Sequence, residues 1–162
     1  MDTPLKYTIE NAAHYPVTML AVYGTNGRIL ELGTGQFSTP LLHFICYPKK
    51  RELVSFEDNH DYYRAAQQFE SDFHTVTKVE NWDDIPIQRH WDVALVDHTR
   101  SRRVDDIKRL AWWANYIIVP DTTQELEDQL ASAFAHQVHF HPLRGTPTLM
   151  VSNLIDISRV TF

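Results

Sequence analysis

Residues 28–40 have the sequence RILELGTGQFSTP, which predicts a short buried strand that turns abruptly into a helix. Gly33 and Gly35 have no Cβ, so the turn between the two elements lets the backbone approach a ligand closely. Ser38 or Thr39 is expected to cap the helix that follows. A corner of this kind is typical of a cofactor-binding site.

An acidic residue, Glu31, precedes the glycine turn. A carboxylate beside such a loop suits a cationic or amine-bearing ligand better than a pyrophosphate, which needs positive charge and free N–H groups. The turn is therefore not expected to bind phosphate.

Short apolar runs alternate with helical stretches from residue 28 onward, which is the pattern of a parallel sheet covered on both faces. Strands are predicted at 28–33, 52–57, 74–79, 92–97 and 115–120. Helices are predicted at 39–47, 61–70, 104–114 and 124–135. Two further strands, 136–141 and 146–153, are separated by a Pro- and Gly-containing turn and predict a terminal hairpin.

The length of 162 residues and the absence of a linker predict a single domain, 1–162. Within it we expect an N-terminal helical segment (1–27), a ligand-binding core (28–123), and a last helix with the terminal hairpin (124–162).

The composition is that of a globular protein, with 43% apolar and 22% charged residues. A net charge of −6 argues against nucleic-acid binding through phosphate contacts. The single cysteine, Cys46, excludes an internal disulfide. No apolar run is long enough to span a membrane and no basic leader is evident, so we expect a cytoplasmic protein without membrane contacts.

Acidic residues also stand at the predicted ends of later strands, where ligands bind in open α/β sheets. Glu57 follows Gly33 by 57 − 33 = 24 residues, the position from which a carboxylate accepts hydrogen bonds from ribose hydroxyls. Asp58 is the neighbouring candidate. The spacing alone is also compatible with a nicotinamide dinucleotide, and a solvated acid at a strand end is the simpler alternative.

Taken in order, these segments resemble the class I S-adenosylmethionine-dependent methyltransferases. The resemblance covers about residues 28–123 and rests on ELGTG (31–35), Glu57, Asn81 with Trp82, and WDVALVD (91–97). It implies a doubly wound, Rossmann-like, mostly parallel seven-stranded sheet of order 3-2-1-4-5-7-6 whose last strand is antiparallel. It also implies S-adenosylmethionine as cofactor, held by Glu31, Gly33, Thr34, Gly35, Ser38, Thr39, Glu57, Asp58, Asn81, Trp82 and Asp97.

The resemblance places Asp97 and His98 beside the methyl donor or the substrate. A methyl sulfonium needs mainly an aligned nucleophile and the exclusion of water, so few catalytic residues are required. His98 is a candidate proton acceptor because an imidazole titrates near neutral pH. As an alternative, Asp97 and Asp121 hold a divalent metal that orients a diol, although Thr122 stands where a further Asn ligand is usual, and metal dependence is not favoured.

Two arginines, Arg102 and Arg103, follow this strand and leave two interpretations open. They contact an anionic substrate, or they pair with Asp105 and Asp106 at the start of a helix. Asp121 is a separate candidate for substrate contact. Trp112 and Trp113, with Tyr116, are expected to pack the helix before the fifth strand rather than to stack on bases.

The leading functional hypothesis is a methyltransferase acting on a small molecule, with no nucleic-acid partner. A second hypothesis is a cofactor-binding module without transfer activity that serves as a partner subunit, because residues 1–27 and 99–103 leave little chain to enclose an acceptor. A nicotinamide-dependent oxidoreductase is a third. A domain of this size also allows a homo-oligomer in which a neighbour completes the site.

Overall fold

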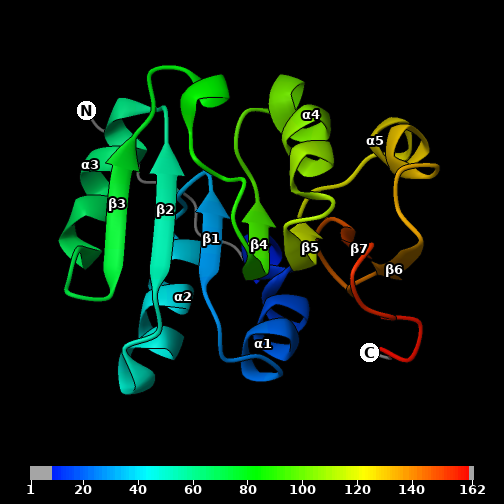
Figure 1. The fold of residues 1–162 in the computed structure, drawn as a ribbon, viewed down its shortest axis with the longest axis horizontal. Coiled ribbons are helices and arrows are strands. Elements are labelled where there is room, and N and C mark those ends of the chain that lie inside the picture. The colour runs from blue at the N-terminus through cyan, green and yellow to red at the C-terminus, as the bar shows by residue number, and fades with distance from the viewer. Residues whose placement is uncertain (1–8, 161–162) are drawn as a thin grey trace.

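A seven-stranded sheet with helices on both faces forms the centre of the computed structural model, which describes residues 9–160 except for the side chains of residues 9 and 11 (Figure 1). Its strand order is β3-β2-β1-β4-β5-β7-β6, as predicted. The strands are β1 (Ile29–Leu32), β2 (Leu53–Glu57), β3 (His74–Lys78), β4 (Trp91–Val96), β5 (Ala114–Val119), β6 (His136–Phe140) and β7 (Thr148–Ser152).

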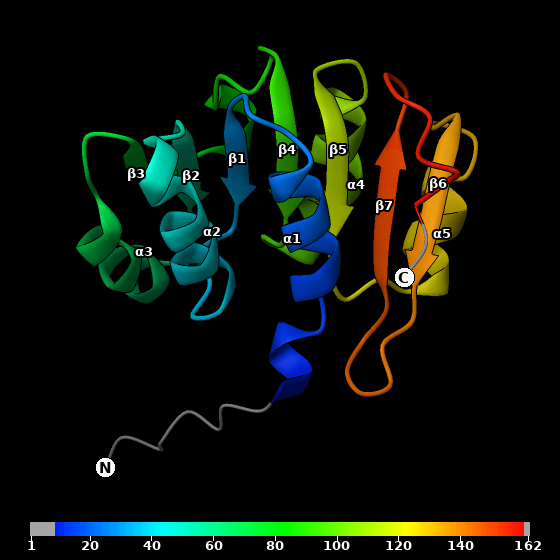
Figure 2. The same ribbon diagram turned by 90° about the horizontal axis from the view of Figure 1, so that it is seen from below.

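The longer helices are α1 (Tyr15–Tyr23), α2 (Ser38–Cys46), α3 (His60–Ala66), α4 (Arg100–Leu110) and α5 (Gln124–Leu130). Short 3-10 turns include η1 (Ile9–Ala12) before α1 and η4 (Trp82–Asp84) after β3. One apolar core joins α1 and α2 to a face of the sheet, and a second joins α4 and α5 to the opposite face. Figure 2 shows from below that helices cover both faces of the sheet. Both faces are buried, as the near-continuous apolar strands predict.

β1 pairs in parallel with β2 and with β4, which is the central strand, and β5 extends the parallel set from β4. β7 is antiparallel to both β5 and β6, which confirms the terminal hairpin. Leu32 is aligned with Phe56 on one side and Val96 on the other, so the tips of three strands lie at one edge of the sheet. Side chains that follow these strands are thereby brought together.

Several local expectations need correction. α2 begins at Ser38 and no side chain caps it, because Thr39 Oγ1 instead accepts from the Gly35 N–H and donates to Glu31. Trp112 and Trp113 are 68% and 40% exposed rather than packed, since α4 ends at Leu110 and a turn carries both rings outward. The expected helices in 1–27 are η1 and α1, with residues 1–8 outside the described chain.

Across residues 9–160, no helix has the length and apolar character needed to cross a membrane.

Candidate cofactor and active site

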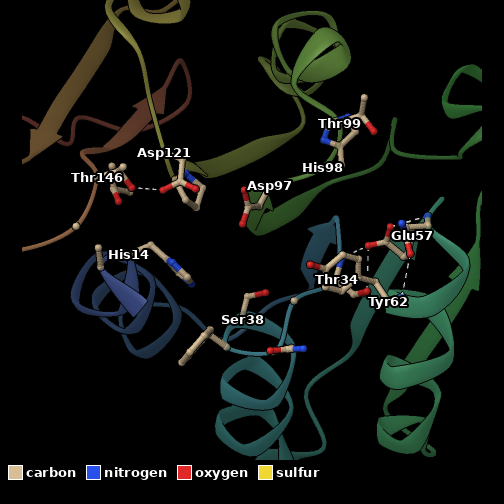
Figure 3. Close-up of a pocket in the computed structure, with 18 of the residues that line it drawn as sticks. His14, Thr34, Ser38, Glu57, Tyr62, Asp97, His98, Thr99, Asp121 and Thr146 are labelled. Carbon is tan, nitrogen blue, oxygen red and sulfur yellow. Dashed lines mark hydrogen bonds between the residues drawn. The ribbon is translucent and has the colours of Figure 1, made fainter. Parts of the chain in front are cut away.

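A cavity of about 590 Å³ opens at the carboxyl edge of the parallel strands (Figure 3). Its walls come from the glycine turn after β1, the tips of β2, β4 and β5, the junction of η1 and α1, and the loop between β6 and β7. Its lining residues include Glu10, His14, Thr34, Gly35, Ser38, Glu57, Asp58, Tyr62, Asp97, Asp121, Thr146 and Thr148. The sheet therefore gathers the predicted strand-end acids around one space.

The turn after β1 depends on Gly33. Its φ is +88°, a conformation that residues with a Cβ rarely adopt. An added Cβ would lie 2.5 Å from the backbone N of His98 and 2.6 Å from its Cα. The glycine thus allows the turn to pack against the tip of β4, whereas Gly35 is the glycine that lines the cavity.

Glu57 is the buried acid that joins the tip of β2 to this turn. Its Oε2 accepts from the Thr34 N–H at 2.7 Å and from Thr34 Oγ1 at 3.0 Å, and its Oε1 accepts from the Asn59 N–H at 2.7 Å. Burial raises the pKa of Glu57, while these hydrogen bonds oppose the shift. The carboxylate is therefore fixed in orientation at the wall of the cavity.

The neighbouring acid, Asp58, holds the next loop. Its Oδ2 accepts from Trp82 Nε1 at 3.0 Å and from Thr99 Oγ1 at 3.1 Å. Partial burial raises the pKa of Asp58, but the hydrogen bonds from Trp82 and Thr99 outweigh burial and the net pKa is lowered. Trp82 is buried and Asn81 caps η4 by accepting from the Asp83 N–H, so neither of these predicted residues lines the cavity.

Glu31 lies beneath the glycine turn and is fully buried. It accepts from Ser55 Oγ at 2.6 Å and from Thr39 Oγ1 at 3.0 Å. Burial raises its pKa to about 7, against the hydrogen bonds from Ser55, Ser38 and Thr39. Glu31 does not line the cavity, so here it supports the turn rather than facing a ligand.

Asp97, at the tip of β4, lines the cavity and forms a 2.5 Å ion pair with Arg103. Burial raises its pKa to about 6, and the Arg103 cation opposes this shift. Arg103 is itself buried, and its guanidinium also donates to the carbonyls of His98 and Pro120. The guanidinium thereby joins the tips of β4 and β5.

His98 is oriented away from the cavity. Its imidazole is fully buried, donates from Nε2 to Asp106 Oδ2 at 2.8 Å, and packs 4.2 Å from Trp82 between ring centroids. Only main-chain atoms of His98 are exposed, so the ring of the predicted proton acceptor does not face the cavity.

Arg102 also does not line the cavity. It pairs with Asp83 at 2.6 Å and with Asp106 at 3.6 Å. Both arginines are therefore held in ion pairs, although Asp83 and Asp97 take the place that the sequence assigned to Asp105.

Asp121 follows β5 and lines the cavity beside Asp97 (Figure 3). It has a positive φ of 53° and accepts from Thr146 Oγ1, which ties β5 to the hairpin loop. Within residues 9–160, no three His, Cys, Asp or Glu side chains are grouped to hold a metal ion. Asp97 and Asp121 contribute two carboxylates, one of them engaged by Arg103.

The sequence interpretation missed the wall made by His14, Thr146 and Thr148. His14 stands just before α1 and is 5% exposed, and the Figure 3 view shows its ring directed toward Asp97 and Ser38. Burial lowers its pKa to about 4, and nearby Asp121 opposes that shift. The sequence signal was a lone histidine before an apolar helix, which has no spacing relation to the strand-end motifs.

Comparison with solved structures identifies the fold. The chain matches the N-terminal domain of human METTL16 in complex with SAH (TM-score 0.67, 16% identity), covering 96% of this chain and 76% of that one. It matches the hMettl16 catalytic domain in complex with MAT2A 3'UTR hairpin 1 with a TM-score of 0.69 and 14% identity, covering 99% of this chain and 76% of that one. It also matches a Klebsiella pneumoniae protein described as an O-methyltransferase, with a TM-score of 0.67 and 13% identity, covering 93% of this chain and 83% of that one.

The chain has the fold of the class I S-adenosylmethionine-dependent methyltransferases, as the sequence resemblance predicted. No protein-family model matches the sequence, and no curated protein matches it.

Proposed function

We propose that this chain binds S-adenosylmethionine in the strand-edge cavity and transfers its methyl group to an acceptor. The observation that carries the proposal is the buried Glu57 carboxylate, which is bonded to the Thr34 turn and lines the cavity. Thr34 and Asn59 occupy three of the roughly four acceptor positions of this carboxylate, and the remaining position on Oε1 can accept a hydrogen bond from a ribose hydroxyl. The fold supports the same assignment.

The charge of the cavity supports a cationic cofactor. Five carboxylates line it, from Glu10, Glu57, Asp58, Asp97 and Asp121, and no Lys or Arg is among the described lining residues. This arrangement attracts a sulfonium and an amino group and repels a pyrophosphate. It favours S-adenosylmethionine over a nicotinamide dinucleotide.

When bound, S-adenosylmethionine supplies a methyl group that is already activated by the positive sulfur. The chain has to fix the cofactor, place a nucleophile behind the methyl carbon and exclude water. Glu57 and the glycine turn serve the first task. The walls around Asp97, Asp121 and His14 surround the remaining space.

We further propose that the acceptor is a small neutral or cationic molecule. The acidic cavity and the net charge of −6 disfavour a polyphosphate chain near the site. The METTL16 complex with a 3'UTR hairpin motivates the competing acceptor, a nucleic acid. Methyl release with a panel of amines, phenols and structured RNAs separates the two, and turnover on RNA alone would overturn the small-molecule proposal.

Calorimetry with S-adenosylhomocysteine tests the cofactor assignment. Glu57→Gln removes the charged hydrogen-bond acceptor, so we expect affinity to fall about tenfold to a hundredfold, as for loss of 1.5–3 kcal/mol. Glu80→Gln is the matched control, because Glu80 is an exposed acid beyond the next strand and should leave affinity unchanged. Absence of binding by the wild-type chain at millimolar ligand would refute the assignment.

The alternative function is a cofactor-binding module that acts as a partner subunit. It is favoured by the small number of residues available to cover an acceptor, chiefly η1, α1 and the β6–β7 loop. Binding of S-adenosylhomocysteine without turnover on any member of the panel would support this module and exclude the enzyme.

A further inference from the structure

The cavity wall farthest along the sheet from Glu57 is built by segments distant in sequence. The β6–β7 loop packs directly on η1, because a Cβ on Gly145 would lie 2.7 Å from the Glu10 carbonyl and 2.8 Å from Ala13 Cβ. This contact places the start of α1 beside the start of β7. His14 and Thr148 are thereby brought to the same wall.

Two polar groups on this wall have no hydrogen-bond partner within residues 9–160: His14 Nε2 and Thr148 Oγ1. Both residues line the cavity, and they are only 5% and 1% exposed. A buried polar group without a partner costs about 1–3 kcal/mol, so proteins seldom retain one without a reason. Two together on a cavity wall indicate groups that bind a ligand.

Among the described residues, His14 is the lining histidine whose side chain keeps a nitrogen free to accept a proton. Burial lowers the pKa of His14 to about 4, so the imidazole is neutral at neutral pH, and nearby Asp121 opposes this shift. Asp97 is already paired with Arg103, and Asp121 accepts from Thr146. The other histidine at the cavity, His98, is bonded to Asp106 with its ring buried.

We propose that His14 is a catalytic residue whose Nε2 accepts the proton of an N–H or O–H nucleophile, while the Thr148 hydroxyl hydrogen bonds to the same acceptor. This inference rests on the proposed methyl transfer. It defines the acceptor as a protic amine or hydroxyl compound bound between α1 and β7.

The proposed step is balanced in atoms and charge. The acceptor's lone pair forms a bond to the methyl carbon, and the carbon–sulfur bond breaks with its electron pair remaining on sulfur as the homocysteine thioether. The acceptor's proton passes to His14 Nε2. The resulting imidazolium is stabilised by the nearby Asp121 carboxylate and then releases the proton to solvent.

The variant His14→Gln tests the inference with the acceptor found by the panel. We expect turnover to fall by about 10²–10⁴-fold, the usual contribution of a general base, while the affinity for S-adenosylhomocysteine stays within twofold of wild type. Added imidazole should restore part of the activity in His14→Gly. The control is His90→Gln, an exposed histidine before β4, which should retain full activity.

A measurement on the unmodified chain keeps the inference testable if the variants fail to fold. Nitrogen-15 NMR of the imidazole rings, with S-adenosylhomocysteine bound at pH 7, should show His14 neutral with an unprotonated Nε2. A proton on Nε2 would overturn the proposal, as would full activity of His14→Gln. Failure of the wild-type chain to bind S-adenosylhomocysteine would instead refute the underlying methyltransferase function.

Discussion

The two ends of the cavity differ in how their polar groups are satisfied. At the glycine turn, Glu57 is bonded to Thr34 and to Asn59. At the α1–β7 wall, His14 Nε2 and Thr148 Oγ1 have no partner among the described residues. The first end is preorganised by its own chain, and the second has hydrogen-bonding capacity left for an incoming molecule.

This difference separates a cofactor end from an acceptor end. A cofactor that is the same in every turnover is best bound by groups already fixed in place, since preorganisation reduces the ordering needed on binding. An acceptor that must lose a proton needs a neutral base with a free lone pair. Substitutions that alter one end at a time therefore test the difference.

The largest effect is expected from Gly33→Ala, which disrupts the preorganised end. The new Cβ meets the His98 backbone at 2.5 Å, and the positive φ adds about 1–3 kcal/mol of strain. We expect the free energy of unfolding to fall by more than about 3 kcal/mol and S-adenosylhomocysteine binding to be lost. Urea unfolding and calorimetry measure the two effects.

The matched control is Gly24→Ala, at the C-terminal end of α1. Its φ is −73°, and the new Cβ would approach Leu20 O at 3.1 Å, so the change should be small. If Gly33→Ala is as stable as this control and still binds the cofactor analogue, the turn does not need glycine at this position and is not a rigid element of the site.

The same contrast explains what the sequence could predict. The strands, the glycine turn and Glu57 follow from local periodicity and from fixed spacing along one βα unit after another, and the sheet order is confirmed. The orientation of the His98 imidazole could not be predicted from the sequence, because it depends on Asp106 in the next helix and on Trp82. His14 was missed because only the contact of Gly145 with η1 places it at the cavity.

An intermediate effect is expected from Glu31→Gln, which changes the buried support of the turn. The pKa of Glu31 is about 7 in the folded chain and 4.5 in the reference state, so the folded chain binds more protons between these values. Glu31 therefore lowers stability as pH rises from 4.5 to 7, by up to about 3 kcal/mol. Gln has no such titration.

The measurement is urea unfolding of wild type and Glu31→Gln at several pH values. The stability of the variant relative to wild type should increase steadily between pH 4.5 and 7. Glu125→Gln, which changes an exposed acid at the start of α5, should follow the wild-type curve. Parallel curves for Glu31→Gln and wild type would show that the carboxyl is ionised throughout this range.

The smallest effect compares Thr148→Val with Thr34→Val, one threonine from each end. Thr34 Oγ1 donates to Glu57, so its loss should destabilise the fold by about 1 kcal/mol and weaken S-adenosylhomocysteine binding. Thr148 Oγ1 has no partner within residues 9–160, so its loss should leave stability unchanged or raise it by about 1 kcal/mol. Because Thr148 is proposed to bind the acceptor, Thr148→Val should raise KM for the acceptor without altering cofactor affinity. Equal destabilisation by the two variants would mean that Thr148 is satisfied within the folded chain, and the two ends of the cavity would then not differ.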